Sequence, residues 1–335
     1  MKKSLIALLV MTVLTACVGC KSFRINVNLD NSTDKTVYLN RMENGKMVTI
    51  DSLVAKNKTV VFKMKQSDNN DALHIMMDGW RRPLVFFADN QDVTITGDCQ
   101  KYGEIKVTAS ETQQKLNEIT AQINLMEDDE EIHFATLVFV KENIDKPVGL
   151  YVLYRYKWAF ELEEFEYLYE NVPAEMQSGY KQVVEKYIAD LKRTQPGEPY
   201  IDFAQTDVNG DVFKMSSLVG YTKIIILDFW ASWCPDCRKA NPDLVKIYNE
   251  FKDKGLEIVS VSLDTDETAW KNAIEKDGLA WPFHVSDLKG WNNEVAQMYT
   301  IAFIPQNLII GKDGLIIEKN LPFEKMEDFL SNTLN

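Results

Sequence analysis

The sequence predicts an α/β domain at the C-terminal end, preceded by a small antiparallel β domain and a helical segment. Residues 23–108 alternate apolar and polar side chains with the two-residue period of strands. Residues 110–193 shift toward the 3.6-residue period of helices, and the chain then alternates apolar strands with helical stretches. We therefore expect four parts, at residues 1–16, 17–108, 109–193 and 194–335.

The first residues are predicted to be a targeting segment. Two lysines precede the apolar stretch from Leu5 to Leu14, which is short for a membrane-spanning helix. The stretch ends in Leu14-Thr15-Ala16-Cys17, which resembles the signal of bacterial lipoproteins, in which the cysteine is acylated. We expect Cys17 to carry the lipid. An ordinary signal peptide with an incidental cysteine is the alternative.

The β domain is predicted from short alternating segments separated by Asn, Asp, Gly and Lys turns. Such regular spacing is typical of a small antiparallel sandwich or barrel. None of the segments carries a group of residues that suggests catalysis. The segments are FRINVNLD, TVYLNR, MVTIDSLV, TVVFKMK, ALHIMM, PLVFFA, DVTIT and EIKVT.

The helical segment contains few Gly or Pro residues and many Glu, Lys, Leu and Tyr residues. Pro147 and Pro173 fit helix starts. Residues 151–169 are dense in aromatic side chains, for which packing between helices is favoured over a partner-binding face. Helices are expected near 110–126, 130–143, 148–170 (continuous or broken) and 174–193.

The last part follows a linker, Thr194 to Pro199, that is rich in Pro and Gly. Apolar strands such as IIILDFW and LEIVSVSL indicate a central and mostly buried sheet. The expected elements are 200–206, 222–231, 236–253, 256–263, 267–277, 289–299, 307–311, 314–319 and 324–334.

Net charge and cysteine content indicate which partners and which redox environment to expect. The chain has 335 residues and a net charge of -13, which disfavours binding to a phosphate backbone, so we expect no nucleic-acid partner. An exported protein meets an oxidising environment, where disulfides persist. Cys99 is expected to be a lone structural thiol, with a bridge to Cys20 as the less favoured alternative.

The sequence from Ile224 to Pro242, IIILDFWASWCPDCRKANP, carries the clearest chemical signal. A buried strand runs into Cys234-Pro235-Asp236-Cys237 and then into a helix. The free N–H groups and positive dipole end of a helix lower the pKa of a thiol, so Cys234 would be partly thiolate near neutral pH. Cys237, one turn later, could resolve a mixed disulfide. A structural disulfide closing so short a loop would stabilise little, and a zinc site would need further ligands; we expect no metal and no cofactor.

From about Pro196 onward the chain resembles thioredoxin-fold thiol-disulfide oxidoreductases of the TlpA/ResA type. The matching residues are Asp228-Phe229-Trp230-Ala231-Ser232-Trp233-Cys234-Pro235-Asp236-Cys237, Pro242, Ile304-Pro305 and the region of Gly210, Leu218 and Gly220. The resemblance implies a redox-active disulfide between Cys234 and Cys237. The upstream β-rich region is only weakly similar to extensions fused to such modules, and no activity follows from it.

Asp228 lies within an apolar strand, where burial would raise the pKa of its carboxyl group. The resemblance assigns it the role of proton acceptor for Cys237; a solvated acid at a strand edge is the alternative. Many TlpA/ResA-type proteins carry a glutamate three residues after the second cysteine, and here that position is Ala240.

The resemblance also implies a substrate-binding surface around the dithiol. Pro305, after Ile304, would be a cis-proline that leaves a backbone edge free for a substrate peptide. Trp233 would shield the cysteine and pack on the substrate, beside Pro235 and Asp236. Gln306 stands where a threonine often follows the proline, which would alter the contact with substrate.

Asp236 between the cysteines bears on the direction of electron flow. A nearby anion disfavours the Cys234 thiolate and so makes the couple less oxidising. We therefore expect a lipid-anchored envelope protein, facing the periplasm, that reduces or isomerises disulfides in exported proteins and receives electrons from a membrane redox partner. A binding or assembly lipoprotein with an auxiliary redox module and a thiol peroxidase are the alternatives. A copper carrier would need a histidine near the thiols, and His284 is the candidate.

Overall fold

Residues 21–67 and 71–334 are described by the computed structural model. They divide into two compact units. Of the described residues, the first contains 21–67, 71–128, 142–151 and 173–179. The second contains 129–141, 152–172 and 180–334. The predicted signal peptide, 1–16, and the predicted lipidation at Cys17 lie outside the described residues. Within those described ranges, no helix combines the length and the apolar character needed to span a bilayer.

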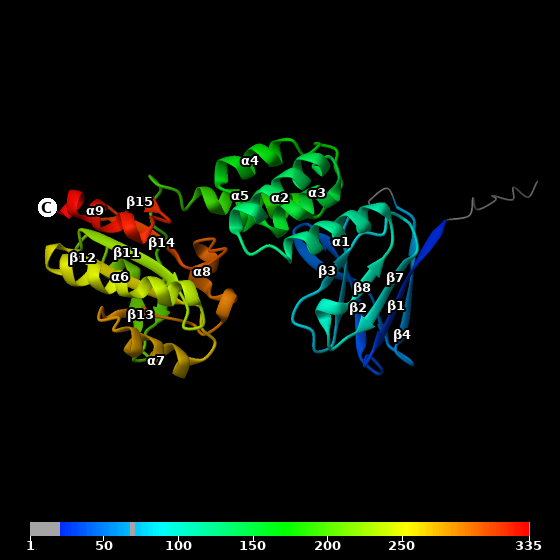
Figure 1. The fold of residues 1–335 in the computed structure, drawn as a ribbon, viewed down its shortest axis with the longest axis horizontal. Helices are drawn as coiled ribbons and strands as arrows, with labels where there is room; N and C mark the ends of the chain where they lie inside the picture. The colour runs from blue at the N-terminus through cyan, green and yellow to red at the C-terminus, as the bar shows by residue number, and fades with distance from the viewer. Residues whose placement is uncertain (1–20, 68–70, 335) are drawn as a thin grey trace, which may run out of the picture. The chain divides into compact units, whose positions relative to one another are not determined.

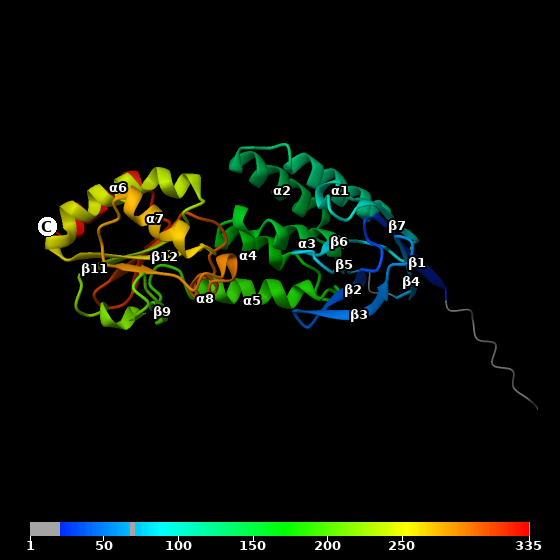
Figure 2. The same ribbon diagram turned by 90° about the horizontal axis from the view of Figure 1, so that it is seen from below.

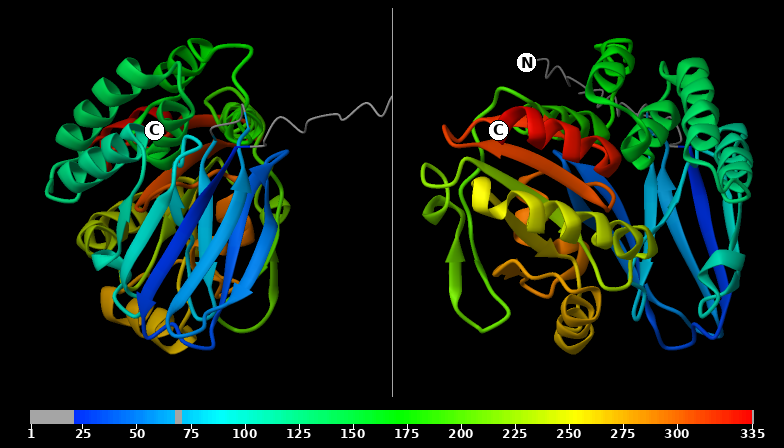
Figure 3. Two further views of the ribbon diagram at one scale, coloured as in Figure 1. Left: turned by 90° about the vertical axis from the view of Figure 1, so that its right-hand side faces the viewer. Right: turned by 60° about the vertical axis from the view of Figure 1, so that its left-hand side comes forward.

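The first unit contains two four-stranded sheets, ordered β4-β1-β7-β8 and β3-β2-β5-β6, whose strands are drawn from dark to light blue in Figure 3. Every second side chain of β1, from Phe23 to Leu29, is buried, which is the two-residue period that predicted a strand. The strands are β1 (Ser22–Asp30), β2 (Thr36–Glu43), β3 (Lys46–Val54), β4 (Thr59–Lys65), β5 (Leu73–Met77), β6 (Leu84–Phe86), β7 (Val93–Asp98) and β8 (Lys106–Thr108).

One detail of this unit differs from the predicted antiparallel sandwich, and one agrees with the expectation that Cys99 is a lone structural thiol. β1 and β7 pair in parallel, whereas the other strand pairs of these sheets are antiparallel. Cys99 is buried and forms no disulfide in the described part of the chain. Its Sγ donates to the carbonyl oxygen of Asn31 at 3.0 Å. Cys20 lies outside the described residues.

The helices of residues 110–193 are α1 (Glu111–Ile123), α2 (Asp129–Asn143), α3 (Pro147–Arg155), α4 (Leu162–Glu170) and α5 (Tyr180–Lys192). The predicted 148–170 helix is broken by a short 3-10 helix at Lys157–Ala159. The aromatic stretch is expected to pack between helices, and Phe165 does so. Its side chain is fully buried, and its ring contacts the rings of Phe160 and Tyr187.

The helix predicted from residue 174 begins only at Tyr180, and the cause is a distant carboxylate. Asp71 accepts hydrogen bonds from the Ser178 hydroxyl at 2.8 Å and from the Gly179 N–H at 2.7 Å. Gly179 also passes so close to Met42 that a Cβ would lie 2.2 Å from the Met42 carbonyl oxygen. These contacts hold the segment before Tyr180 in a non-helical conformation.

The C-terminal part of the second unit is a five-stranded sheet of order β13-β12-β11-β14-β15 (Figure 1). β11 pairs in parallel with β12 and antiparallel with β14. A separate hairpin joins β9 and β10. The strands are β9 (Ala204–Thr206), β10 (Val212–Lys214), β11 (Ile224–Trp230), β12 (Leu256–Ser262), β13 (Phe283–Val285), β14 (Gln306–Gly311) and β15 (Ile316–Lys319).

Helices cover both faces of this sheet. α6 and α9 pack against each other on one face, and Figure 2 shows α8 on the side of the sheet opposite α6. The sequence did not predict the three-residue strands β10 and β13, and the helix expected at 289–299 is reduced to a 3-10 turn (Gly290–Asn292) and α8. The helices are α6 (Pro235–Phe251), α7 (Glu267–Asp277), α8 (Glu294–Met298) and α9 (Phe323–Leu334).

Candidate active site

The dithiol lies where the central strand β11 meets helix α6. All seven residues of β11 are buried, since the strand has neighbours on both edges and helices on both faces. Cys234 is the N-cap of α6, and Pro235 occupies the first turn, where its missing N–H removes no helical hydrogen bond. Cys237 follows within that first turn. The strand and helix together place both sulfurs at the carboxyl end of a buried strand.

Cys234 and Cys237 form a disulfide, and their Cα atoms are 5.3 Å apart. The N–H of Cys237 donates to Cys234 Sγ at 3.1 Å. In the reduced protein the same N–H and the helix dipole would stabilise a thiolate on Cys234. Asp236 is exposed in the same turn, and its negative charge opposes that thiolate.

The loop that precedes β14 approaches Cys234. The Ile304–Pro305 peptide bond is cis, and Cys234 Sγ lies 3.8 Å from the Ile304 carbonyl oxygen. Gln306, expected to alter the contact with substrate, instead points inward: it is buried, and its Oε1 accepts from the Ala302 N–H at 3.1 Å. The Gln306 side chain therefore stabilises the loop that contains Ile304 and Pro305 through its hydrogen bond to Ala302.

Asp228 lies in the middle of β11 and is only 2% exposed, which excludes a solvated acid at a strand edge. Its Oδ2 accepts a hydrogen bond from the Ser260 hydroxyl at 2.9 Å. The Ser260 oxygen in turn accepts from Trp281 Nε1 at 3.0 Å. Burial raises the pKa of Asp228 to about 7, and the Ser260 hydrogen bond opposes that rise.

We predict that Ser260→Ala destabilises the protein more at pH 8 than at pH 5. At pH 8 the Asp228 carboxylate is ionised and loses a hydrogen bond worth about 2 kcal/mol, whereas at pH 5 the carboxyl group is protonated and loses less. Urea unfolding at the two pH values measures the difference. Ser286→Ala is the matched control, because the buried Ser286 hydroxyl donates to the neutral Ser262 carbonyl at 2.8 Å. This substitution should lower the free energy of unfolding by the same amount at both pH values.

Charged side chains that the sequence analysis did not single out hold the loop before Cys234. Asp264 is buried and accepts from the N–H and hydroxyl of Ser232 at 2.9 and 2.5 Å. Arg238 donates to the Ser232 carbonyl at 3.1 Å and forms an ion pair with Asp277, to which Asn241 also donates. The sequence offered a signal for Asp264, because this residue comes two positions after the end of the strand LEIVSVS, which pairs with the motif strand.

The remaining predicted residues fall into two groups. Trp233, Pro235, Asp236, Ile304 and Pro305 surround the disulfide at the protein surface, fully or partly exposed. His284 does not join them: it lies in β13, which β12 separates from β11, with its ring stacked on Trp281. In the described part of the chain no cluster of three His, Cys, Asp or Glu residues could hold a metal ion.

Comparisons with known proteins agree with this geometry. A family model described as thioredoxin-like matches residues 221–316, and a domain of unknown function, DUF4369, matches residues 23–116. A thiol-disulfide oxidoreductase ResA of Bacillus cereus is 32% identical over 133 residues, which are 40% of this chain and 73% of that protein. ResA of Bacillus anthracis is 31% identical over the same shares of the two chains.

Solved structures match the same C-terminal region. The thioredoxin domain of a thiol-disulfide oxidoreductase from Bacteroides vulgatus is 32% identical, with a TM-score of 0.39, and the match covers 42% of this chain and 98% of that one. A thiol-disulfide oxidoreductase from Bacteroides fragilis is 30% identical, with a TM-score of 0.38, covering 40% and 98%. The family model and the ResA relatives confirm the predicted thioredoxin-like fold of the C-terminal domain and its oxidoreductase class.

Proposed function

Because this chain belongs to the ResA-type thiol-disulfide oxidoreductases, we propose that it reduces disulfides of exported proteins through the Cys234–Cys237 pair. The observation that supports this best is the position of Cys234, which caps α6 and accepts the Cys237 N–H. That environment favours a thiolate at the residue nearest the proline loop.

The proposed reaction has two exchange steps. The Cys234 thiolate attacks one sulfur of a substrate disulfide, and the other substrate sulfur leaves as a thiolate that takes up a proton. Cys237 then loses its proton and attacks Cys234 Sγ, which releases the second substrate thiol. The substrate gains two electrons, and the protein ends with the Cys234–Cys237 disulfide.

Asp228 is proposed to accept the proton of Cys237. It is the only titratable residue of the buried strand that leads to the motif. A carboxyl group whose pKa is about 7 exchanges protons efficiently near neutral pH.

The oxidised protein needs a two-electron donor to work again. We propose a redox partner in the membrane that transfers electrons to the Cys234–Cys237 disulfide, with this protein held on the periplasmic side by a lipid on Cys17. This proposal is supported by the lipoprotein-like signal ending at Cys17 and by the exported setting that the signal implies.

Reaction of the reduced full-length chain with disulfide-bonded insulin tests the proposed function. Alkylation of new thiols should show reduction of insulin with matching formation of the Cys234–Cys237 disulfide. Failure of the reduced protein to exchange with any protein disulfide or small disulfide would contradict the proposed function. It would favour the alternative of a binding or assembly lipoprotein.

We predict that Asp236→Asn makes the couple more oxidising, because it removes an anion that disfavours the Cys234 thiolate. The reduction potential should become less negative by about 30 mV or less, since Asp236 is exposed and its charge is screened by solvent. Equilibration with defined thiol buffers measures the shift. Asp243→Asn, which removes an exposed acid two turns further along α6, should leave the potential unchanged.

A further inference from the structure

Three large apolar side chains are exposed around Cys234. Trp233 is 51% exposed, Trp291 is 43% exposed and Phe303 is 40% exposed. Trp233 directly precedes Cys234, and Phe303 directly precedes Ile304, whose carbonyl oxygen lies 3.8 Å from Cys234 Sγ. Single exposed apolar side chains are ordinary, but several gathered beside one reactive sulfur indicate an interaction site.

The two tryptophans form a pair. Their ring centroids are 6.3 Å apart and their planes are inclined at 55°. Trp233 Nε1 donates to the Leu263 carbonyl at 3.3 Å, so its indole has a fixed orientation although half of its surface is in solvent. A rigid aromatic pair of this kind offers contact area at a low cost in conformational entropy.

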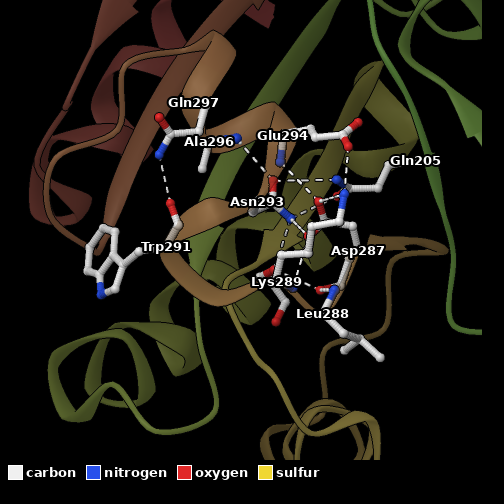
Figure 4. A network of polar contacts seen from close by, with 11 residues as sticks. Gln205, Asp287, Leu288, Lys289, Trp291, Asn293, Glu294, Ala296 and Gln297 are labelled. Atoms are coloured by element: carbon white, nitrogen blue, oxygen red, sulfur yellow. Dashed lines mark hydrogen bonds and ion pairs between the residues drawn. The ribbon is translucent and has the colours of Figure 1, made fainter. Parts of the chain in front are cut away.

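A polar network, buried at Asn293 and exposed at Gln297, holds the backbone of Trp291 in place (Figure 4). Gln297 Nε2 donates to the Trp291 carbonyl at 2.7 Å. Two residues after Trp291, the fully buried Asn293 donates through Nδ2 to Asp287 Oδ1 at 3.0 Å and to Gln205 Oε1 at 3.3 Å. In Figure 4 the indole of Trp291 points away from these residues, so the network orders its backbone and leaves its ring free for contact.

We infer that Trp233, Trp291 and Phe303 form an aromatic platform that selects substrate segments with a large apolar side chain next to the cysteine. This inference rests on the proposed function and adds its substrate class. Burying an apolar side chain on the platform stabilises the encounter, and aromatic side chains in such positions commonly dominate binding energy. An acidic flank is disfavoured, because Asp236 lies exposed beside Cys234 and the chain carries a net charge of -13.

The test compares disulfide peptides that differ only in the residue flanking the cysteine, which is Phe, Gly or Asp. The reduced full-length chain should reduce the Phe peptide with the highest kcat/KM and the Asp peptide with the lowest. Trp291→Ala should lower kcat/KM for the Phe peptide about tenfold. The same variant should change kcat/KM for the Gly peptide and for bis(2-hydroxyethyl) disulfide less than about twofold. Trp291→Phe should restore most of the preference, which separates loss of contact from loss of folding.

Two further variants sharpen the comparison. Gln297→Ala releases the Trp291 carbonyl but keeps the ring, and should give a smaller loss in the same direction. Tyr221→Ala is the matched control: Tyr221 is 84% exposed but lies just before β11, at the end of that strand away from the motif, and should change nothing.

Equal kcat/KM values for the three peptides with the unaltered protein would contradict the inferred substrate selection by the aromatic platform. So would an equal loss on all substrates in Trp291→Ala, because the residue would then act through the dithiol. Failure of the unaltered reduced protein to react with the linear disulfide bis(2-hydroxyethyl) disulfide would instead contradict the proposed function itself.

Discussion

Replacing Cys237 with serine is expected to arrest the protein as a mixed disulfide between Cys234 and its substrate. Cys234 has the helix N-terminus and the Cys237 N–H to stabilise its thiolate. Cys237 lies within the first turn and is 1% exposed, against 4% for Cys234. Serine at 237 keeps the backbone N–H but cannot attack the mixed disulfide. Turnover should therefore fall at least about a thousandfold while the first exchange step survives.

The measurement is accumulation of a covalent adduct, followed by non-reducing electrophoresis and mass spectrometry. Cys234→Ser should form no adduct at all. Cys99→Ala is the control, because Cys99 is a buried thiol in the first unit and should leave both steps unchanged. An adduct that forms in Cys234→Ser but not in Cys237→Ser would reverse the assigned roles of the two cysteines.

Asp228→Asn is expected to slow resolution of the mixed disulfide about a hundredfold near pH 7.5, a typical effect of removing a general base. With the pKa of Asp228 at about 7, the unaltered protein should resolve more slowly as the pH falls from 8 to 6. The asparagine variant should lose that step in its pH profile. A retained step with its midpoint near 7 would mean that another group accepts the proton.

The same substitution should stabilise the oxidised protein at alkaline pH. Between pH 3.8 and about 7 the unfolded chain releases the Asp228 proton while the folded chain keeps it, so rising pH favours unfolding. Above pH 7 the folded protein bears a buried carboxylate at a cost of at most about 4 kcal/mol. Asp228→Asn removes this cost, so its advantage in urea unfolding should grow from pH 4 to pH 9. An advantage independent of pH would contradict the buried titration.

Local patterns made the dithiol and its strand predictable. The spacing of Cys234 and Cys237 and the apolar run before them depend on neighbouring residues only, and the structure places them at a strand-to-helix junction. The burial of Asp228 followed from the same run. Strand positions in the first unit were equally local, because alternation marks each strand regardless of its partner.

Features that depend on distant parts of the chain escaped prediction. The late start of α5 is caused by Asp71, more than a hundred residues earlier in the chain. The parallel pairing of β1 with β7 depends on topology that no single segment encodes. Trp291 lies in the predicted helix 289–299, which the structure replaces at this point with a 3-10 turn, and its contact with Trp233 joins two distant segments of the chain.

The reduction potential of the Cys234–Cys237 pair in the full-length chain tests the central claim most directly. The detergent-solubilised protein would be equilibrated in defined thiol buffers and its thiols alkylated and counted. The account predicts one reversible two-electron transition near the value of thioredoxin, about -270 mV. A value of about -120 mV would make the protein an oxidant, and the absence of any reversible transition would contradict a redox role for this pair.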